Sequence, residues 1–128
     1  MAHYRPLVIV PAILLLSLAV AAPALAVDDE DLGFETTEDL VAVCSAPAAS
    51  AAQFACTAFI EATVQYHDAV SDRKNLKRLI CYPSGTSIED GRVAFLGWAA
   101  DNSGDAELMG EMPVVGLVRA LAAAYPCR

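Results

Sequence analysis

Positive charge is scarce in this chain. Its 128 residues include 8 Lys and Arg against 16 Asp and Glu, which gives a formal net charge of −8. Nucleic acids and anionic membrane surfaces select basic proteins, so neither is expected as a partner. The balance fits a soluble protein or one that meets a basic partner.

Catalytic motifs are missing as well. The sequence has no G-x-S-x-G serine motif, no glycine-rich phosphate loop and no H-E-x-x-H metal motif. Of the 2 histidines, only His67 lies beyond the first 26 residues. Asp68 is its candidate partner for general-base catalysis, but adjacent residues on a helix point about 100° apart and do not face each other. We therefore predict a packed, hydrogen-bonded His67, no cofactor and no enzyme activity.

The first 26 residues have the features of a secretory signal peptide. A short segment with one firm positive charge, Met1–Arg5, precedes an almost wholly apolar run over residues 7–22, and Ala24-Leu25-Ala26 is a small-x-small cleavage site. An uncleaved membrane anchor is the alternative. The run is shorter than the roughly 20 residues that span a bilayer, and Pro11 interrupts it. We predict cleavage after residue 26, a periplasmic or secreted location, and no membrane association of the mature protein.

Cleavage at that point leaves 102 residues with 7 basic and 16 acidic side chains, a net charge of −9. That length corresponds to one domain, and a domain so small buries a limited share of its surface. It contains all four cysteines, Cys44, Cys56, Cys81 and Cys127. Zinc is the alternative use for them, but there is no C-x-x-C pair and one histidine. We predict two disulfides formed in an oxidising compartment, and no metal.

Helix signals recur through this domain, and no segment alternates like a strand. Residues 27–35 include four consecutive acids and are predicted to be a flexible acidic tail. Capping signatures or a first-turn proline place helix starts near Thr36, Ser50, Ser87 and Pro113. The predicted fold class is all-α: a small bundle of about four helices over residues 36–128, stapled by two disulfides.

Two apolar stripes are predicted to face the core. The long second helix, expected to run to about Ser71, has core-type residues at spacings of three and four, and so has the last helix. The first stripe is Cys56, Phe59, Ile60, Thr63, Tyr66, His67 and Val70. The second is Val114, Leu117, Val118, Leu121 and Tyr125.

The order of the helices suggests a disulfide pairing. Cys44 and Cys56 bracket the first connection, whereas Cys81 precedes the third helix and Cys127 follows the fourth. Antiparallel neighbours bring the start of one helix close to the end of the next, so we predict Cys44–Cys56 and Cys81–Cys127. A crossed pairing, Cys44 with Cys81 or Cys127, stays open because the packing order is not visible in the sequence.

Residues 101–111 are predicted to form an exposed loop between the last two helices, and they are the first candidate for partner binding. Acidic side chains there suit a basic or histidine-bearing cleft, with electrostatics setting association rate and specificity. A solvated loop without a partner is the alternative. The loop imitates the start of a calcium site, but Gly104 comes too early and Met112 replaces the bidentate glutamate. The candidate residues are Asp101, Asn102, Asp105, Glu107 and Glu111.

A basic segment is the second candidate. Within six residues it holds four of the seven positive charges that follow residue 26, namely Arg73, Lys74, Lys77 and Arg78. Cations at a helix C-terminus are favoured by the helix dipole, so a solvated helix end is one interpretation. A partner-binding patch is the other.

The cysteine framework is similar to that of the Tai-type immunity proteins. The similarity rests on a helix that ends in Cys44, a second that opens with Cys56-Thr57-Ala58-Phe59, the turn Cys81-Tyr82-Pro83, and the ending Ala124-Tyr125-Pro126-Cys127. It covers essentially the whole mature chain. The resemblance implies a periplasmic helical homodimer that occludes the active-site cleft of a type VI secretion amidase effector, which cleaves peptidoglycan. It implies no catalysis by the immunity protein itself.

This chain departs from that family pattern at both candidate segments. Residues 73–78 are basic where the family is usually shorter and more apolar, and residues 101–111 are acidic where a His-Pro-rich sequence is expected. A second hypothesis is an HdeA-type acid-stress chaperone, whose carboxylates lose charge in acid so that apolar helix faces bind clients. Two disulfides and the lack of basic terminal tails argue against it. An orphan helical interaction domain is the third hypothesis.

Overall fold

The computed structural model describes residues 33–128, which form five α-helices and, within that range, no β-strand. The helices are α1 (Thr37–Cys44), α2 (Ala51–Lys74), α3 (Ile88–Asp101), α4 (Ala106–Gly110) and α5 (Pro113–Ala124). The predicted all-α class is confirmed, and the one added helix is the short α4. The predicted signal peptide and residues 27–32 of the predicted tail lie outside the described residues.

Two capping boxes start α1 and α3 where the sequence predicted helix starts. The Thr36 hydroxyl accepts a hydrogen bond from the backbone N–H of Asp39 (3.1 Å), whose carboxylate accepts one from the Thr36 backbone (2.9 Å). Ser87 and Asp90 repeat the arrangement. The pKa of the Asp39 carboxyl is held below its ordinary value by hydrogen bonds from the Thr36 hydroxyl (2.8 Å) and the Thr36 backbone, and that of Asp90 by those from the Ser87 backbone and hydroxyl. Their contribution to helix stability is therefore present at neutral pH and is lost as the pH falls through the lowered pKa values.

Helix α2 begins after its predicted cap, Ser50, and ends one turn later than predicted, at Lys74 instead of Ser71. Asn75 follows in the left-handed conformation with a φ of 52°. Asparagine tolerates that conformation better than most residues, so it ends the helix as a C-terminal cap. The two cations of the last turn, Arg73 and Lys74, also favour helix there.

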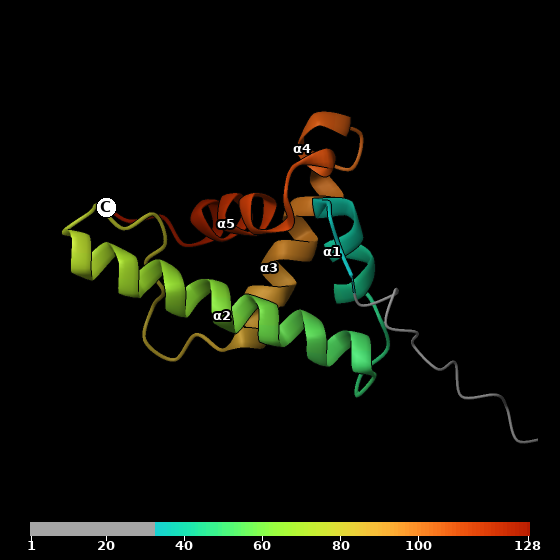
Figure 1. Ribbon diagram of the computed structural model, residues 1–128, viewed down its shortest axis with the longest axis horizontal. Helices are drawn as coiled ribbons and strands as arrows, with labels where there is room; N and C mark the ends of the chain where they lie inside the picture. The colour runs from blue at the N-terminus through green and yellow to red at the C-terminus, as the bar shows by residue number, and fades with distance from the viewer. Residues whose placement is uncertain (1–32) are drawn as a thin grey trace, which may run out of the picture.

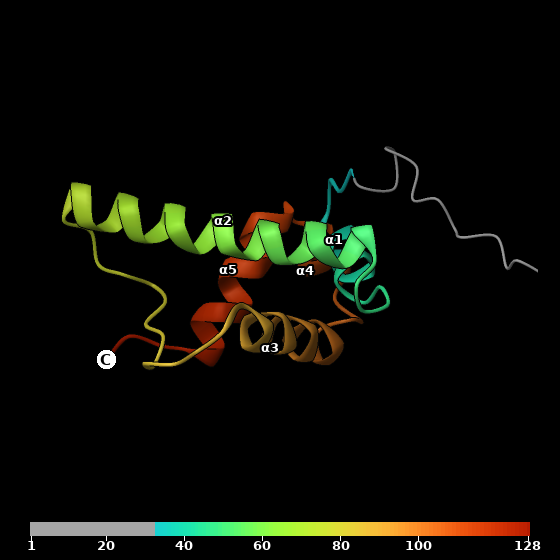
Figure 2. The same cartoon turned by 90° about the horizontal axis from the view of Figure 1, so that it is seen from below.

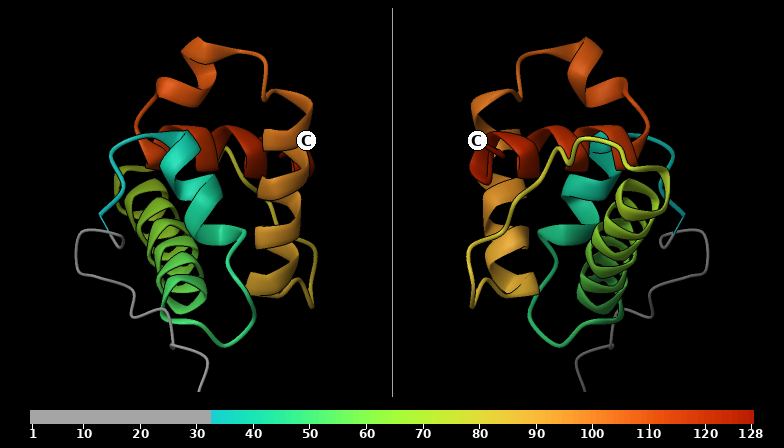
Figure 3. Two further views of the ribbon diagram at one scale, coloured as in Figure 1. Left: turned by 90° about the vertical axis from the view of Figure 1, so that its right-hand side faces the viewer. Right: turned by 90° about the vertical axis from the view of Figure 1, so that its left-hand side faces the viewer.

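Helix α1 is the centre of the bundle. It contacts each of the other four helices and lies between α2 and α3 (Figure 3). Its Leu40 is fully buried, together with Phe95 from α3 and Leu117 from α5. Helix α2 runs along the length of the molecule, and α4 stands at one end of it (Figure 1). The core therefore surrounds α1 and extends along α5 to Ile80, which is 1% exposed.

Both predicted disulfides are present, and the crossed pairing is excluded. Cys44–Cys56 joins the end of α1 to α2, and Cys81–Cys127 joins the segment before α3 to the chain after α5. A backbone hydrogen bond from Cys81 to Tyr125 (2.9 Å) lies beside the second bridge. No helix within residues 33–128 has both the length and the apolar character needed to cross a membrane.

Candidate protein-binding site

Residues 101–111 form an arm at the end of the molecule, which Figure 1 shows beyond α3 and α5. The prediction of a plain loop is wrong for this arm, because it contains α4. The Asp105 carboxylate caps that helix by accepting from the backbone N–H groups of Glu107 (3.0 Å) and Leu108 (3.1 Å). Met109, only 8% exposed, anchors the helix to the domain. The arm is therefore an ordered projection.

The candidate residues of the arm divide into two groups. Asn102 donates to the Trp98 carbonyl (2.7 Å), and Asp105 caps α4. The Glu111 carboxylate accepts two hydrogen bonds from Arg119, both of 2.7 Å. Within residues 33–128 no side-chain partner contacts the carboxylates of the other two candidates, Asp101 and Glu107, which are exposed. These two carboxylates are the charges that the arm can offer to a partner.

The far end of the arm is fixed to α1. The Glu111 carbonyl accepts hydrogen bonds from the Thr37 backbone N–H (2.8 Å) and from the Thr37 hydroxyl (3.1 Å). Thr37 is fully buried against Gly116 of α5. A partner that meets the arm therefore meets a surface whose shape is set before binding, which lowers the entropy lost in the complex.

The basic segment also divides. Arg78 makes two hydrogen bonds to the Asp72 carboxylate, of 2.9 and 3.1 Å, and these raise the pKa of its guanidinium. Arg73, Lys74 and Lys77 are exposed and have no carboxylate partner in the described part of the chain. Three of the four predicted cations are therefore available to a partner.

A hollow of about 310 Å³ lies beside this basic segment. We call it the α2–α5 groove; its apolar walls come from the second half of α2, the segment 76–79 and the start of α5. Exposed fractions reach 72% for Tyr66, 57% for Leu76 and 56% for Leu79. The apolar residues that line it are Tyr66, Val70, Leu76, Leu79, Val114 and Val118.

The core-facing stripes predicted for α2 and α5 are partly wrong at this groove. Tyr66 and Val114, for example, continue the stripes in the sequence but are 72% and 41% exposed. The reason is length: the second half of α2 extends past α1, so its stripe has no helix of the core to cover it (Figure 2). Sequence periodicity identified the apolar face correctly. It could not show at which residue other helices stop packing against that face.

His67 holds the segment 76–79, one wall of the groove, against α2 through a hydrogen bond. Its Nε2 accepts a hydrogen bond from the Leu79 backbone N–H (3.1 Å), so Nδ1 carries the proton and donates to the Asp68 carboxylate (3.0 Å). The expectation that these neighbours do not face each other is wrong, because their side chains lie within hydrogen-bonding distance. His67 is packed and hydrogen-bonded, as predicted. Both ring nitrogens are engaged, which leaves neither for a substrate.

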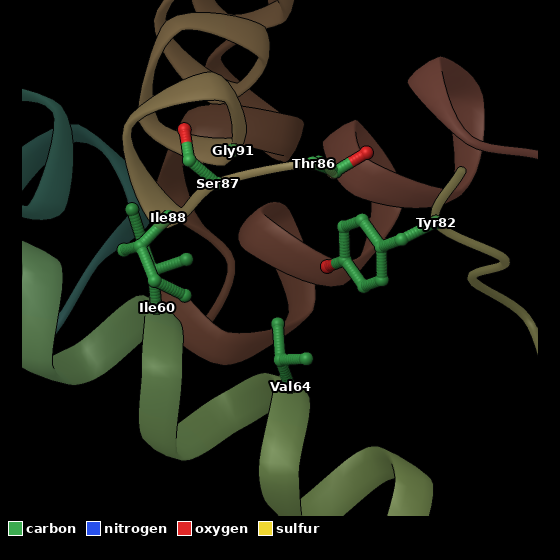
Figure 4. Close-up of a pocket in the computed structure, with 7 residues that line it drawn as sticks. All are labelled: Ile60, Val64, Tyr82, Thr86, Ser87, Ile88 and Gly91. Carbon is green, nitrogen blue, oxygen red and sulfur yellow. The ribbon is translucent and has the colours of Figure 1, made fainter. Parts of the chain in front are cut away.

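A smaller cavity of about 140 Å³ separates α2 from the start of α3. Figure 4 shows the Tyr82 ring beside it, with the hydroxyl directed toward the cavity near Val64 and Ile60. That hydroxyl is buried and has no hydrogen-bond partner among the residues that the structure describes. Burial raises the Tyr82 pKa to about 12. No group of three or more metal-ligating side chains occurs within residues 33–128.

Replacing Tyr82 with phenylalanine is expected to leave the protein as stable as the wild type or up to about 1 kcal/mol more stable. The substitution removes a buried hydroxyl that no partner compensates, while the ring keeps its packing. Urea unfolding of the oxidised mature chain measures the change. Tyr66→Phe, at a position 72% exposed, is the control and should stay within about 0.5 kcal/mol. A loss above about 1 kcal/mol in Tyr82→Phe would contradict the expectation.

A family model described as Rap1a immunity proteins matches residues 36–127. Neither the curated proteins nor the solved structures give a match. The matched segment contains the five helices of the described residues, both disulfides, the arm and the groove. Because the family model covers most of the sequence, this chain belongs to the family of Rap1a immunity proteins.

Proposed function

We propose that this protein neutralises a type VI secretion effector that cleaves peptidoglycan as an amidase, and that it does so by occluding the active-site cleft. The observation that carries the proposal is the family match over residues 36–127, since an immunity protein has a protein effector as its partner. The resemblance of the cysteine framework to Tai-type proteins supports the amidase as target. The match also favours this hypothesis over the HdeA-type chaperone.

The arm over residues 101–111 is the element proposed to enter the cleft. It projects from the end of the bundle, and its base is fixed through Thr37 and Glu111. Asp101 and Glu107 present free carboxylates to a cleft whose catalytic groups are basic or histidine-bearing. Electrostatic complementarity of this kind raises the association rate and selects the partner.

The effector acts on peptidoglycan, so its inhibitor has to meet it in the cell envelope. We therefore propose export by a cleaved signal peptide over residues 1–26 and a periplasmic location, where the disulfides Cys44–Cys56 and Cys81–Cys127 form. A homodimer, as the Tai-type resemblance implies, is part of the proposal. Sedimentation of the mature chain at micromolar concentration measures it.

The test uses the mature chain, residues 27–128, and the effector encoded beside its gene. Stoichiometric protein should abolish peptidoglycan hydrolysis by the effector at neutral pH, and the products released without inhibitor should identify amidase cleavage. We expect the double variant Asp101→Lys, Glu107→Lys to weaken inhibition at least about tenfold. Glu61→Lys, which reverses an exposed charge on α2, is the control and should change it less than about twofold.

The possible outcomes distinguish three parts of the proposal: the role of the arm, the amidase as target, and the immunity function. Full inhibition by wild type and by the double variant alike would remove the arm from the mechanism and leave the immunity function. Inhibition of an effector that cleaves another peptidoglycan bond would replace the amidase. Binding of many unfolded proteins, only after acidification, would favour the chaperone and overturn the immunity function.

A further inference from the structure

We propose that the α2–α5 groove is a second docking surface for the same partner, and that it receives a segment with a large apolar side chain flanked by carboxylates. The inference rests on the proposed function, because it assigns the occupant to the effector. The groove would give the effector a second contact, at the end of α2 opposite to the disulfide Cys44–Cys56. The occupant's chemistry follows from the groove's walls and its rim.

The walls call for an apolar anchor. Tyr66, Leu76 and Leu79 are each more than half exposed, yet they surround one hollow instead of being scattered. Contiguous apolar surface of this kind on a small protein marks an interaction site. A hollow of about 310 Å³ has room for a large side chain of a partner. Buried apolar anchors in pockets supply most of the affinity of a typical interface.

The walls are also fixed before binding. The segment 76–79 has no regular secondary structure, but the Leu79 backbone is held to His67 of α2 by the 3.1 Å hydrogen bond. At its C-terminal end the segment continues into Ile80, which is 1% exposed, and into the Cys81–Cys127 bridge. A wall held at these points loses little freedom when a partner binds.

The rim determines the sign of the occupant's charge. Residues 33–128 hold seven cations, and three of them are paired with carboxylates, namely Arg78, Arg92 and Arg119. The cations without a carboxylate partner in that range are Arg73, Lys74, Lys77 and Arg128. Three of these four therefore belong to one segment, and Lys77 itself lines the groove.

The carboxylates nearest to the groove do not cancel this charge. Asp72 is bonded to Arg78, and Asp68 is shared between His67 and Arg78. The rim is thus a basic patch on a domain that is otherwise acidic, so a carboxylate-bearing segment is attracted to it. A second copy of this chain fits less well, because a two-fold axis through the groove would bring the two basic rims together.

Calorimetric titration of the neighbouring-gene effector into matched variants tests the proposal. Leu76→Ser removes an apolar wall residue that is 57% exposed, and its control Val93→Ser removes one that is 58% exposed on α3. Lys77→Glu reverses the rim charge, and its control Arg128→Glu reverses an unpaired, exposed positive charge that does not line the groove. We expect Kd to rise at least about tenfold for each groove variant and less than about twofold for each control.

Salt provides a second readout. Raising the ionic strength should weaken binding of the wild type more than binding of Lys77→Glu, because that variant has lost an attractive charge. Unchanged thermal midpoints establish that the variants are folded.

Groove variants that bind like wild type would overturn the proposal and leave the immunity function intact. A dimer that dissociates in Leu76→Ser while effector affinity is unchanged would overturn it in favour of a second copy as the occupant. An effector that does not bind the wild type would overturn the proposed function. It would also overturn the assignment of an effector segment to the α2–α5 groove.

Discussion

Removing the Cys81–Cys127 disulfide is expected to lower the free energy of unfolding by about 4 kcal/mol, from the loop-closure entropy of the unfolded chain alone. The bridge closes a sequence separation of 46 residues, whereas Cys44–Cys56 closes one of 12, for which the same relation gives about 3 kcal/mol. Small domains have total stabilities of about 5–15 kcal/mol. Loss of the disulfide that closes the longer loop should therefore leave a domain of marginal stability.

The measurement is urea unfolding of the oxidised mature chain with Cys81→Ala, Cys127→Ala, compared with Cys44→Ala, Cys56→Ala. The second pair also loses packing, because both of its sulfurs lie in residues that are fully buried. The first pair lies at the surface, since Cys81 is exposed, so its loss acts mainly through the unfolded state. A loss below about 1 kcal/mol for the longer loop would contradict the entropic account.

Exposure also predicts the order of reduction. Thiol–disulfide exchange requires access of a thiolate to a sulfur, so dithiothreitol should open Cys81–Cys127 in the native protein before Cys44–Cys56. Alkylation and mass mapping of the first species formed reads the order directly. Opening of the buried bridge first would mean that α1 and the first turns of α2 separate more readily than the chain end.

Features fixed by neighbouring residues were predictable from the sequence. The capping boxes at Thr36 and Ser87 depend on residues three positions apart, and both helices begin where the sequence indicated. The disulfide pairing followed from helix order. Cys44–Cys56 bridges two consecutive helices, and Cys81–Cys127 joins a residue before α3 to a residue after the last helix. The capping inference needs no knowledge of how the helices pack, whereas the crossed pairing stayed open until the packing order was seen.

Features that depend on the extent of packing were not predictable. A stripe at helical spacing looks the same in the sequence whether other helices bury it, as at Ile60 beside Gly91 of α3, or leave it exposed, as at Tyr66. The α2–α5 groove therefore became visible only in the structure. The capping of α4 by Asp105 was also missed, since a five-residue helix has too few positions to show a periodic pattern.

Gly116→Ala is the second substitution with a large expected effect, a loss of about 3 kcal/mol in the free energy of unfolding. A methyl group there would lie 2.9 Å from the Thr37 Cβ and closer still to its Oγ1 and Cγ2. Thr37 is fully buried and cannot turn away. Displacing it would also break its two hydrogen bonds to the Glu111 carbonyl, which hold the base of the arm.

Gly97→Ala is the matched control, since Gly97 lies inside α3 with nothing within 4 Å of an added methyl group. There the substitution should stabilise the protein by about 0.5–1 kcal/mol, because alanine favours helix more than glycine. Thr37→Ala in the Gly116→Ala background should restore part of the loss, since it removes the two closest atoms. Chemical unfolding of the wild type, Gly116→Ala, Thr37→Ala and the double variant reports the coupling. Equal stability of the two glycine variants would contradict the contact between α1 and α5 on which the arm depends.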